Sequence, residues 1–179
     1  CTVCHYVGIF SDISQQKQDE ERIRYLTTHD PLTQLPNRAQ FTFNLEFAIA
    51  RAKRDRMRVA VFFIGLDRFK RINETLGHSV GDRLLLSMAQ RLQECLLETD
   101  VVAHFGGDEF TVIMETITEP QEAAHAAQKF IDVLSRVIDI DGHELLTTPS
   151  IGISLYPDDG KDAHTLVMHS TIAMDRVKM

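Results

Sequence analysis

The sequence of 179 residues is short of cysteine and has no long hydrophobic run, and each shortage excludes a class of protein. Three cysteines cannot build a disulfide framework, so we expect a reducing compartment. No apolar stretch approaches the roughly 20 residues of a membrane-spanning helix, and no signal-peptide pattern opens the chain. We therefore expect a cytoplasmic domain, either separate or within a larger membrane-associated protein.

Positive charge is also scarce. Lysine and arginine number 19 against 26 acidic residues, which gives a formal net charge of −7. This balance argues against nucleic acid as a partner, but it allows a single nucleotide carried with magnesium. The 44% of hydrophobic residues is typical of a globular protein, and the length predicts one domain, or one domain with an appended segment. Because the chain begins at Cys1 rather than methionine, we expect a piece of a longer protein.

The N-terminal part predicts a strand followed by a helix. Residues 1–13 are rich in β-forming side chains, which favours a terminal strand. Ser14 is a candidate N-cap for a polar helix over 14–29, whose apolar stripe consists of Ile23 and Leu26. Such a thin stripe buries little surface by itself. This helix therefore either pairs with another copy or is a solvated connector.

The next segment predicts a helix, a buried strand and a second helix. Asn37 can cap a helix whose apolar residues recur at helical spacing: Phe41, Leu45, Ala48, Ile49 and Ala52. The run VAVFFI at 59–64 is continuous and apolar, which predicts a strand buried on both faces. Ser79 opens a capping-box pattern with Asp82 and predicts the start of the second helix.

The C-terminal half alternates hairpins and helices. We expect a hairpin over 101–115, a helix that opens at 118–121, and strands at 138–140 and 144–155 joined at Asp141-Gly142. A last helix over 162–178 would bury Leu166, Ala173 and Val177. The whole order predicts an α+β fold, in which helices wrap a central mixed, largely antiparallel sheet.

The tip of the first hairpin carries two acids side by side. Gly106 and Gly107 suit a turn, whereas Asp108 and Glu109 repel each other at a strand entry. Either the turn is solvated or the acids face a hard metal ion. Asp67 follows the buried strand, and neighbouring strand ends lie close together, so three carboxylates can converge. Magnesium takes such ligands together with substrate phosphates in phosphoryl and nucleotidyl transfer.

Two further polar residues lie between the buried strand and the hairpin. Asn73 offers a donor and an acceptor and Asp82 an acceptor, a pair that can read a guanine edge. Asp82 can instead serve the capping box of Ser79. The residue pattern alone thus leads to a nucleotide site and no further.

The chain resembles the GGDEF domain, the diguanylate cyclase family of bacterial cyclic di-GMP signalling. Gly106-Gly107-Asp108-Glu109-Phe110 spells the family name. Further family segments stand in order at 30–38 (DPLTQLPNR), 66–82 (LDRFKRINETLGHSVGD), 150–154 (SIGIS) and 158–160 (DDG). The resemblance implies a nucleotide-cyclase or palm-like fold, with the GGDEF domain at 30–179 and its C-terminal end truncated. Residues 1–13 resemble the end of a PAS sensor domain and 14–29 a signalling helix, and in such proteins an EAL phosphodiesterase domain often follows.

The resemblance also implies roles for individual residues. In the family, two subunits each hold one GTP, so a homodimer makes the product. By position, Asn73 and Asp82 would bind guanine, and Asp108 would ligate Mg2+ or Mn2+. Glu109 would support the metal or deprotonate the 3′-hydroxyl. Backbone groups from Leu66 to Phe69 would lie against the phosphates, with Leu66 also near the metal, and Lys178 would bind phosphate.

Several positions depart from the family pattern. The metal-binding aspartate of the buried strand is Gly65 here, and Asp67 is a partial substitute if it can reach the ion. His104 stands where an arginine commonly precedes the turn, Leu97 replaces the arginine of the inhibitory product site, and Asp175 replaces a tyrosine. We therefore expect a GTP-binding regulatory domain with impaired nucleotidyltransferase activity that controls a fused EAL phosphodiesterase. The alternative is an active or weakened cyclase that makes cyclic di-GMP from two GTP.

Overall fold

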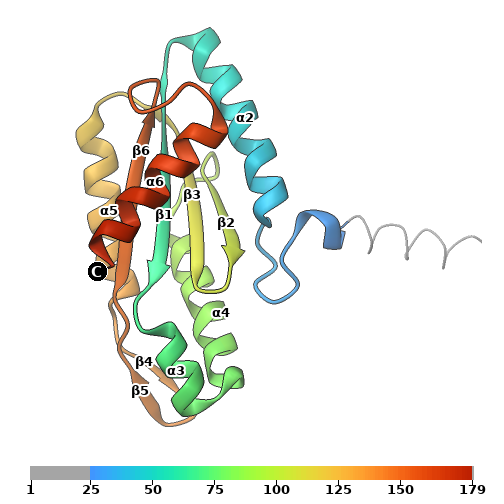
Figure 1. Cartoon of the computed structure of the whole chain (residues 1–179), viewed down its shortest axis with the longest axis vertical. Coiled ribbons are helices and arrows are strands. Elements are labelled where there is room, and N and C mark those ends of the chain that lie inside the picture. Colours follow the sequence, from blue (N-terminus) through green and yellow to red (C-terminus); the bar gives the residue numbers. More distant parts are fainter. Residues whose placement is uncertain (1–24, 179) are drawn as a thin grey trace, which may run out of the picture.

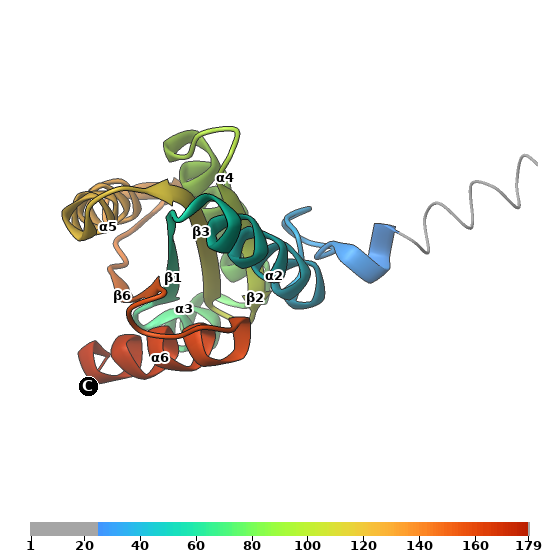
Figure 2. The same cartoon turned by 90° about the horizontal axis from the view of Figure 1, so that it is seen from above.

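The computed structural model describes residues 25–178, which fold into three layers with a β-sheet between two pairs of helices (Figures 1 and 2). The strand predicted at 1–13 and most of the helix predicted at 14–29 lie outside the described residues. Residues 25–28 are helical. Within the described part, no helix combines the length and the apolar character needed to cross a membrane.

The main sheet has four strands in the order β2-β3-β1-β6. They are β1 (Arg58–Leu66), β2 (Val101–Gly106), β3 (Glu109–Ile117) and β6 (Pro149–Tyr156). All three pairings are antiparallel, so the predicted α+β class is confirmed and the sheet is more regular than the expected mixed one. The run at 59–64 is buried on both faces as predicted, because β1 lies between two strands and both helix layers cover it.

Side chains alternate along β1 and so divide the core in two. The even positions, such as Phe62 and Ile64, pack under α4 (His78–Cys95) and α5 (Pro120–Leu134). The odd positions, such as Val61, pack under α2 (Arg38–Asp55) and α6 (Ala163–Val177). Gly65 is an odd position, and it therefore faces the layer that contains α6.

The helix α2 confirms its sequence signals. The Asn37 side chain accepts a hydrogen bond from the backbone amide of Gln40, as an N-cap does. The five apolar residues predicted for its buried face are the ones that are buried: Phe41, Leu45, Ala48, Ile49 and Ala52. Its C-terminal cap is Arg56, which has a left-handed backbone with φ 55° and ψ 38°.

The capping role predicted for Ser79 is wrong. Residues 68–96 form two helices, α3 (Phe69–Leu76) and α4, and α4 begins one residue before Ser79. Its N-cap is Gly77, which has a φ of 89° and no side chain to offer. Asp82 therefore makes no capping hydrogen bond, and it is exposed on the first turns of α4.

The second hairpin is partly as predicted. The strands β4 (Ile138–Ile140) and β5 (His143–Leu145) pair through Asp141 and Gly142, whose φ values of 55° and 80° suit a tight hairpin turn. The single strand predicted over 144–155 is wrong, however, because β5 ends at Leu145 and β6 starts at Pro149 in a different sheet. The break coincides with Thr147, whose hydroxyl donates to the Asp67 backbone oxygen at 2.9 Å.

The helix α6 lies directly on β6, and its buried face differs from the predicted one. Leu166 is buried as expected, but Val177 is 66% exposed, and the buried positions are Ala163, Leu166, Ser170 and Met174. Gly152 explains the close approach. A Cβ atom there would lie 1.9 Å from the Ser170 backbone oxygen and 2.4 Å from the Met174 backbone nitrogen. Only glycine at this position allows α6 to lie so near the sheet.

Candidate functional site

The candidate site is built where β1 ends beside the β2–β3 turn. In the sheet register, Gly65 pairs with Glu109 of β3 on one side and with Ser150 of β6 on the other. The Leu66 amide then donates to the Asp108 backbone oxygen at 3.0 Å. The hydrogen bonds of the sheet therefore hold the end of β1 beside the acidic pair.

The β2–β3 turn is tied to the loop before α2 through a buried histidine. Gly106 and Gly107 have φ values of 131° and 60°, which favour glycine at this turn. His104 is only 6% exposed; its Nε2 lies 3.1 Å from the Gly107 backbone oxygen and its Nδ1 lies 3.1 Å from Asp30 Oδ1. Burial acts to raise the pKa of Asp30, but hydrogen bonds from Thr33 and His104 outweigh it and lower that pKa.

Lys178 reaches back into the site from the C-terminal end of α6. Its Nζ donates to Asp108 Oδ2 at 2.8 Å, and the two side chains are 30% and 32% exposed. The same nitrogen lies 2.8 Å from the point where a Cβ atom on Gly65 would be. Sequence reasoning connected Lys178 with phosphate, but it missed this pairing, because the two residues stand on elements far apart in the chain.

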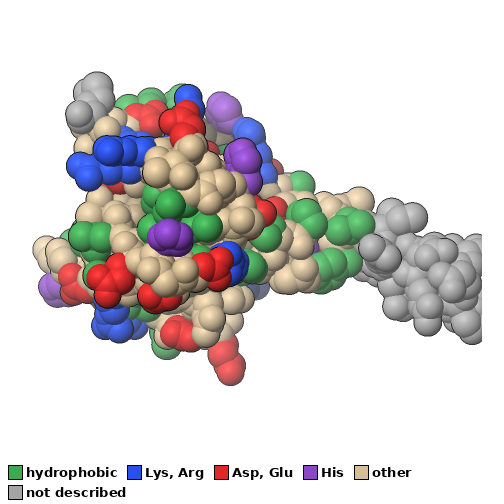
Figure 3. Space-filling view, turned by 90° about the horizontal axis from the view of Figure 1, so that it is seen from below, with side chains coloured by type: hydrophobic (Ala, Val, Ile, Leu, Met, Phe, Trp, Pro, Cys, Tyr) green, Lys and Arg blue, Asp and Glu red, His purple; other side chains and the backbone are tan. Residues whose placement is uncertain are grey.

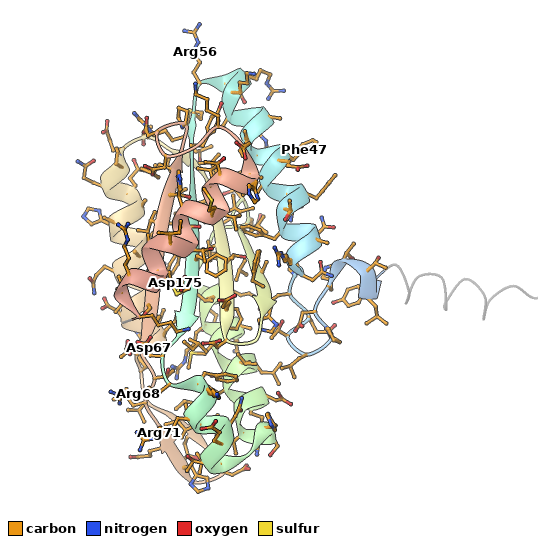
Figure 4. The ribbon with its side chains drawn as sticks, in the orientation of Figure 1. Phe47, Arg56, Asp67, Arg68, Arg71 and Asp175 are labelled. Atoms are coloured by element: carbon orange, nitrogen blue, oxygen red, sulfur yellow. The ribbon has the colours of Figure 1, made fainter. Side chains whose placement is uncertain are left out.

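Glu109 lies among several charges. Burial, followed by the negative charges of Asp108 and Asp175, raises its pKa above the ordinary range of glutamate, although Lys178 and Arg38 act in the opposite direction. Asp175 lies on the last turns of α6, above the end of β1 (Figure 4). The carboxyl group of Glu109 is therefore more costly to ionise than an exposed one.

Asp67 joins β1 to the start of β6. Its Oδ1 accepts a hydrogen bond from the Ser150 hydroxyl at 2.8 Å, and its Oδ2 accepts one from the Thr148 hydroxyl at 2.5 Å. Its backbone amide donates to the Thr148 oxygen at 2.8 Å. Both carboxylate oxygens thus have hydroxyl partners at the start of β6. Metal ligation by Asp67 stays a prediction.

These side chains do not fit a site for two metal ions held by several carboxylates. Gly65 offers no oxygen from a side chain, and Asp108 already has an ammonium partner. Among residues 25–178, no three His, Cys, Asp or Glu side chains stand close enough to hold a metal ion together. A divalent ion at Asp108 would have to compete with Lys178 for Oδ2 of that carboxylate.

The two residues predicted to read guanine lie on adjacent helices. Asn73 of α3 packs against α4 so closely that a Cβ on Gly81 would lie 1.9 Å from Asn73 Oδ1. That oxygen is buried and has no hydrogen-bond partner within the described part of the chain. Asp82 follows Gly81 directly and is exposed. An unsatisfied buried acceptor beside an exposed carboxylate is an arrangement that a ligand with hydrogen-bond donors can complete.

The segment Leu66–Phe69, which was predicted to lie against the phosphates, connects β1 to α3. Leu66 and Phe69 are buried, and Arg68 turns the chain into α3 with a φ of 60°. Beside α3, Arg68 and Arg71 line a cavity of about 350 Å3 with four less polar neighbours, Ile72, Thr75, Leu76 and Leu146. Figure 4 shows Arg68 and Arg71 on the same side of the molecule as Asp67, which directly follows β1. Seen from below, this end of the molecule mixes acidic, basic and hydrophobic side chains (Figure 3).

Comparison with known proteins gives a consistent result. Residues 27–179 match the family model described as "Diguanylate cyclase, GGDEF domain". The chain is 42% identical over 153 residues to MucR of Pseudomonas aeruginosa, a bifunctional diguanylate cyclase/cyclic di-GMP phosphodiesterase, which covers 86% of the chain. It is 36% identical over 169 residues to NbdA of the same organism, a cyclic di-GMP phosphodiesterase, which covers 93% of the chain.

Solved structures agree with the fold. The GGDEF domain of TpbB (YfiN) from Pseudomonas aeruginosa has a TM-score of 0.82 and 40% identity, and the match covers 84% of this chain and 88% of that one. A sensory box/GGDEF family protein from Caulobacter crescentus has a TM-score of 0.81 and 39% identity, with 84% and 97% covered. The chain spans only 22% of MucR and 21% of NbdA.

Proposed function

The chain belongs to the diguanylate cyclase GGDEF domain family, and from this premise we propose that it binds GTP and regulates a fused output domain, with little or no synthesis of cyclic di-GMP. The observation that carries the proposal is Gly65. It stands between Glu109 and Ser150 in the sheet and brings no carboxylate to the site. Asp67, two residues later, has both its carboxylate oxygens hydrogen-bonded to hydroxyl groups, those of Thr148 just before β6 and Ser150 within it.

The loss of one charged ligand has a large expected effect on rate. Diguanylate cyclases of this family use divalent metal ions, which neutralise the charge that develops on phosphate oxygens. Each ~1.4 kcal/mol of lost transition-state stabilisation lowers the rate tenfold. Several kcal/mol lost at such a site therefore leaves activity lower by orders of magnitude, while the contacts that bind the nucleotide remain.

Binding of GTP rests on a different set of residues. Asn73 supplies a buried, unpaired amide oxygen, and Asp82 supplies a neighbouring exposed carboxylate for guanine. The amides around Leu66–Phe69 and the ammonium of Lys178 would lie against the phosphates. These roles keep the residues predicted from sequence, and none of them requires Gly65 to carry a side chain.

The output domain is proposed from the relatives. MucR and NbdA carry phosphodiesterase activity in their names and are about four times the length of this chain. We propose that the protein likewise joins this domain to an EAL phosphodiesterase, with a PAS-like domain on the N-terminal side. GTP bound at the GGDEF domain would then be the signal that the phosphodiesterase receives.

A second function is favoured by one specific observation, the complete Gly106–Phe110 sequence at a correctly formed turn. In this alternative the domain is an active or weakened cyclase. A homodimer would bring two GTP together, Asp108 and Glu109 would hold Mg2+ or Mn2+, and Glu109 would assist deprotonation of the 3′-hydroxyl. The ion would have to separate Asp108 from Lys178 in every active subunit.

One experiment separates the two functions. The full-length protein is incubated with GTP and either Mg2+ or Mn2+, cyclic di-GMP is measured by chromatography, and phosphodiesterase activity is measured with and without GTP. We expect product near the detection limit and a phosphodiesterase rate that changes with GTP. Asn73→Ala should abolish that response, whereas Lys161→Ala, outside the site, should keep it. Synthesis at 1 s−1 or faster, an ordinary enzyme rate of roughly 1–1000 s−1, would overturn the regulatory proposal.

A further inference from the structure

Lys178 occupies a space that exists only because residue 65 is glycine. A Cβ atom at that position would lie 2.8 Å from Lys178 Nζ and 3.0 Å from Met174 Sδ. Both atoms are the ends of flexible side chains, so they can fill the space in this sequence and leave it when another side chain stands there. The ammonium group therefore lies where an aspartate at position 65 would begin its own side chain.

The packing of α6 fixes the backbone from which the Lys178 side chain extends. Asp162 caps the helix by accepting a hydrogen bond from the Thr165 amide at 2.9 Å. Farther along, the backbone around Ser170 lies against Gly152 of β6. The last turn then continues to Lys178, whose amide donates to the Met174 oxygen at 3.1 Å. Lys178 thus extends from a packed helix, and its direction into the site is set by α6.

The ion pair with Asp108 has the geometry of a strong interaction. The nitrogen and oxygen are 2.8 Å apart, the distance of a charge-assisted hydrogen bond, and both side chains are about two-thirds covered. A divalent ion bound at Asp108 Oδ2 would have to break this contact, and one bound at the other oxygen would stand next to a positive charge. One oxygen of Asp108 is already paired with a cation that belongs to the chain.

We propose that Lys178 is the resident cation of this site and that the domain binds the triphosphate of its nucleotide without a divalent ion. An ammonium group has three N–H donors, and Asp108 takes one of them, so two remain for phosphate oxygens. Arg68, which precedes α3, and Arg71 within it add positive charge. Within residues 25–178 neither of them forms an ion pair. The proposal rests on the binding of GTP proposed above and defines how the phosphates are held.

The test measures binding rather than catalysis. GTP affinity of the full chain is determined by isothermal titration calorimetry in excess EDTA and again in 5–10 mM Mg2+, roughly the range that saturates nucleotide. Binding of Mn2+ alone is followed by electron paramagnetic resonance. We expect the two GTP affinities to agree within about twofold, and we expect no tight Mn2+ site. Lys178→Met should weaken GTP binding in EDTA by about tenfold or more.

Lys161→Met is the matched control, because Lys161 precedes the other end of α6 and lies far from Asp108 in the chain. It should leave both readouts unchanged. If GTP binds at least tenfold tighter with Mg2+ than with EDTA, the resident-cation proposal is wrong and the proposed function still stands. If the wild type binds Mn2+ tightly in the absence of nucleotide, the proposal is also wrong. Absence of GTP binding under both conditions would overturn the proposed function together with this inference.

Discussion

Replacement of Gly152 by alanine tests the close packing that brings α6 to the sheet. Gly152 lies on β6 and has no positive φ, so its backbone suits any residue, and only the available space opposes a side chain. The added Cβ would meet the Ser170 oxygen at 1.9 Å and the Met174 nitrogen at 2.4 Å. Both are backbone atoms, which cannot rotate away. The helix itself must move.

The magnitude follows from these distances. An ordinary contact between heavy atoms requires about 3.5 Å, so α6 would have to withdraw by about 1.5 Å from β6. Overpacking of a core in this way costs roughly 1–3 kcal/mol. For a domain of this size, ~1 kcal/mol lowers the melting temperature by about 2–4 °C, so we expect a decrease of roughly 2–12 °C.

Urea denaturation followed by circular dichroism measures the change, and Gly65→Ala is a matched control. Gly65 lies on the neighbouring strand and faces the same helix, but its Cβ would meet only the movable ends of Lys178 and Met174. We expect this control to stay within about 0.5 kcal/mol of wild type, since the alanine also gains the ~0.5–1 kcal/mol by which glycine weakens a strand. If Gly152→Ala is as stable as Gly65→Ala, the described packing of α6 is refuted.

Two further predictions concern the acids of the site. Burial and neighbouring negative charges raise the pKa of Glu109, so its ionised form destabilises the folded state at neutral pH, and Glu109→Gln should raise the melting temperature at pH 7. This gain should vanish as the pH falls below the ordinary pKa of glutamate, where the carboxyl is protonated in both states; an equal gain at pH 3 and pH 7 in thermal scans would contradict the assignment. Asp67→Ala removes the acceptor of two hydroxyl hydrogen bonds and leaves the buried Ser150 hydroxyl without its partner, so we expect a loss of about 2 kcal/mol in urea denaturation. A loss below about 0.5 kcal/mol would show that Asp67 does not hold β6 to β1.

Local sequence signals were sufficient to predict a structural element where residues of that element alone determine its conformation. The apolar run at 59–64 predicts a strand buried on both faces, because no side of it offers a polar stripe to water. Asn37 predicts the start of α2, since its own side chain makes the capping hydrogen bond. Asp141-Gly142 predicts the β4–β5 turn, because both residues tolerate positive φ.

Signals failed where contacts between distant segments decide the structure. Ser79 looks like an N-cap, but Gly77 begins α4 because the turn from α3 needs a positive φ there. The alternation at 144–155 runs on in sequence, yet hydrogen bonds to Asp67 divide it between two sheets. In the candidate site, too, local features could be predicted and a contact between distant segments could not. The acids of the turn are visible in the sequence, whereas the contact of Lys178 with Asp108 depends on how α6 packs.

The central place of β1 in the sheet has a consequence for the synthesis of the protein. Phe62 of β1 pairs with Val112 of β3 and with Ile153 of β6, both of which leave the ribosome later. At about 5–20 residues per second, β1 waits roughly 2–10 s for its first neighbour and about twice as long for the second. During that time an uncharged six-residue run of high β-propensity has no partner, which is the composition of aggregation-prone segments. The basic residues at 51–58 just before it supply a charged flank that opposes such association while the chain is incomplete.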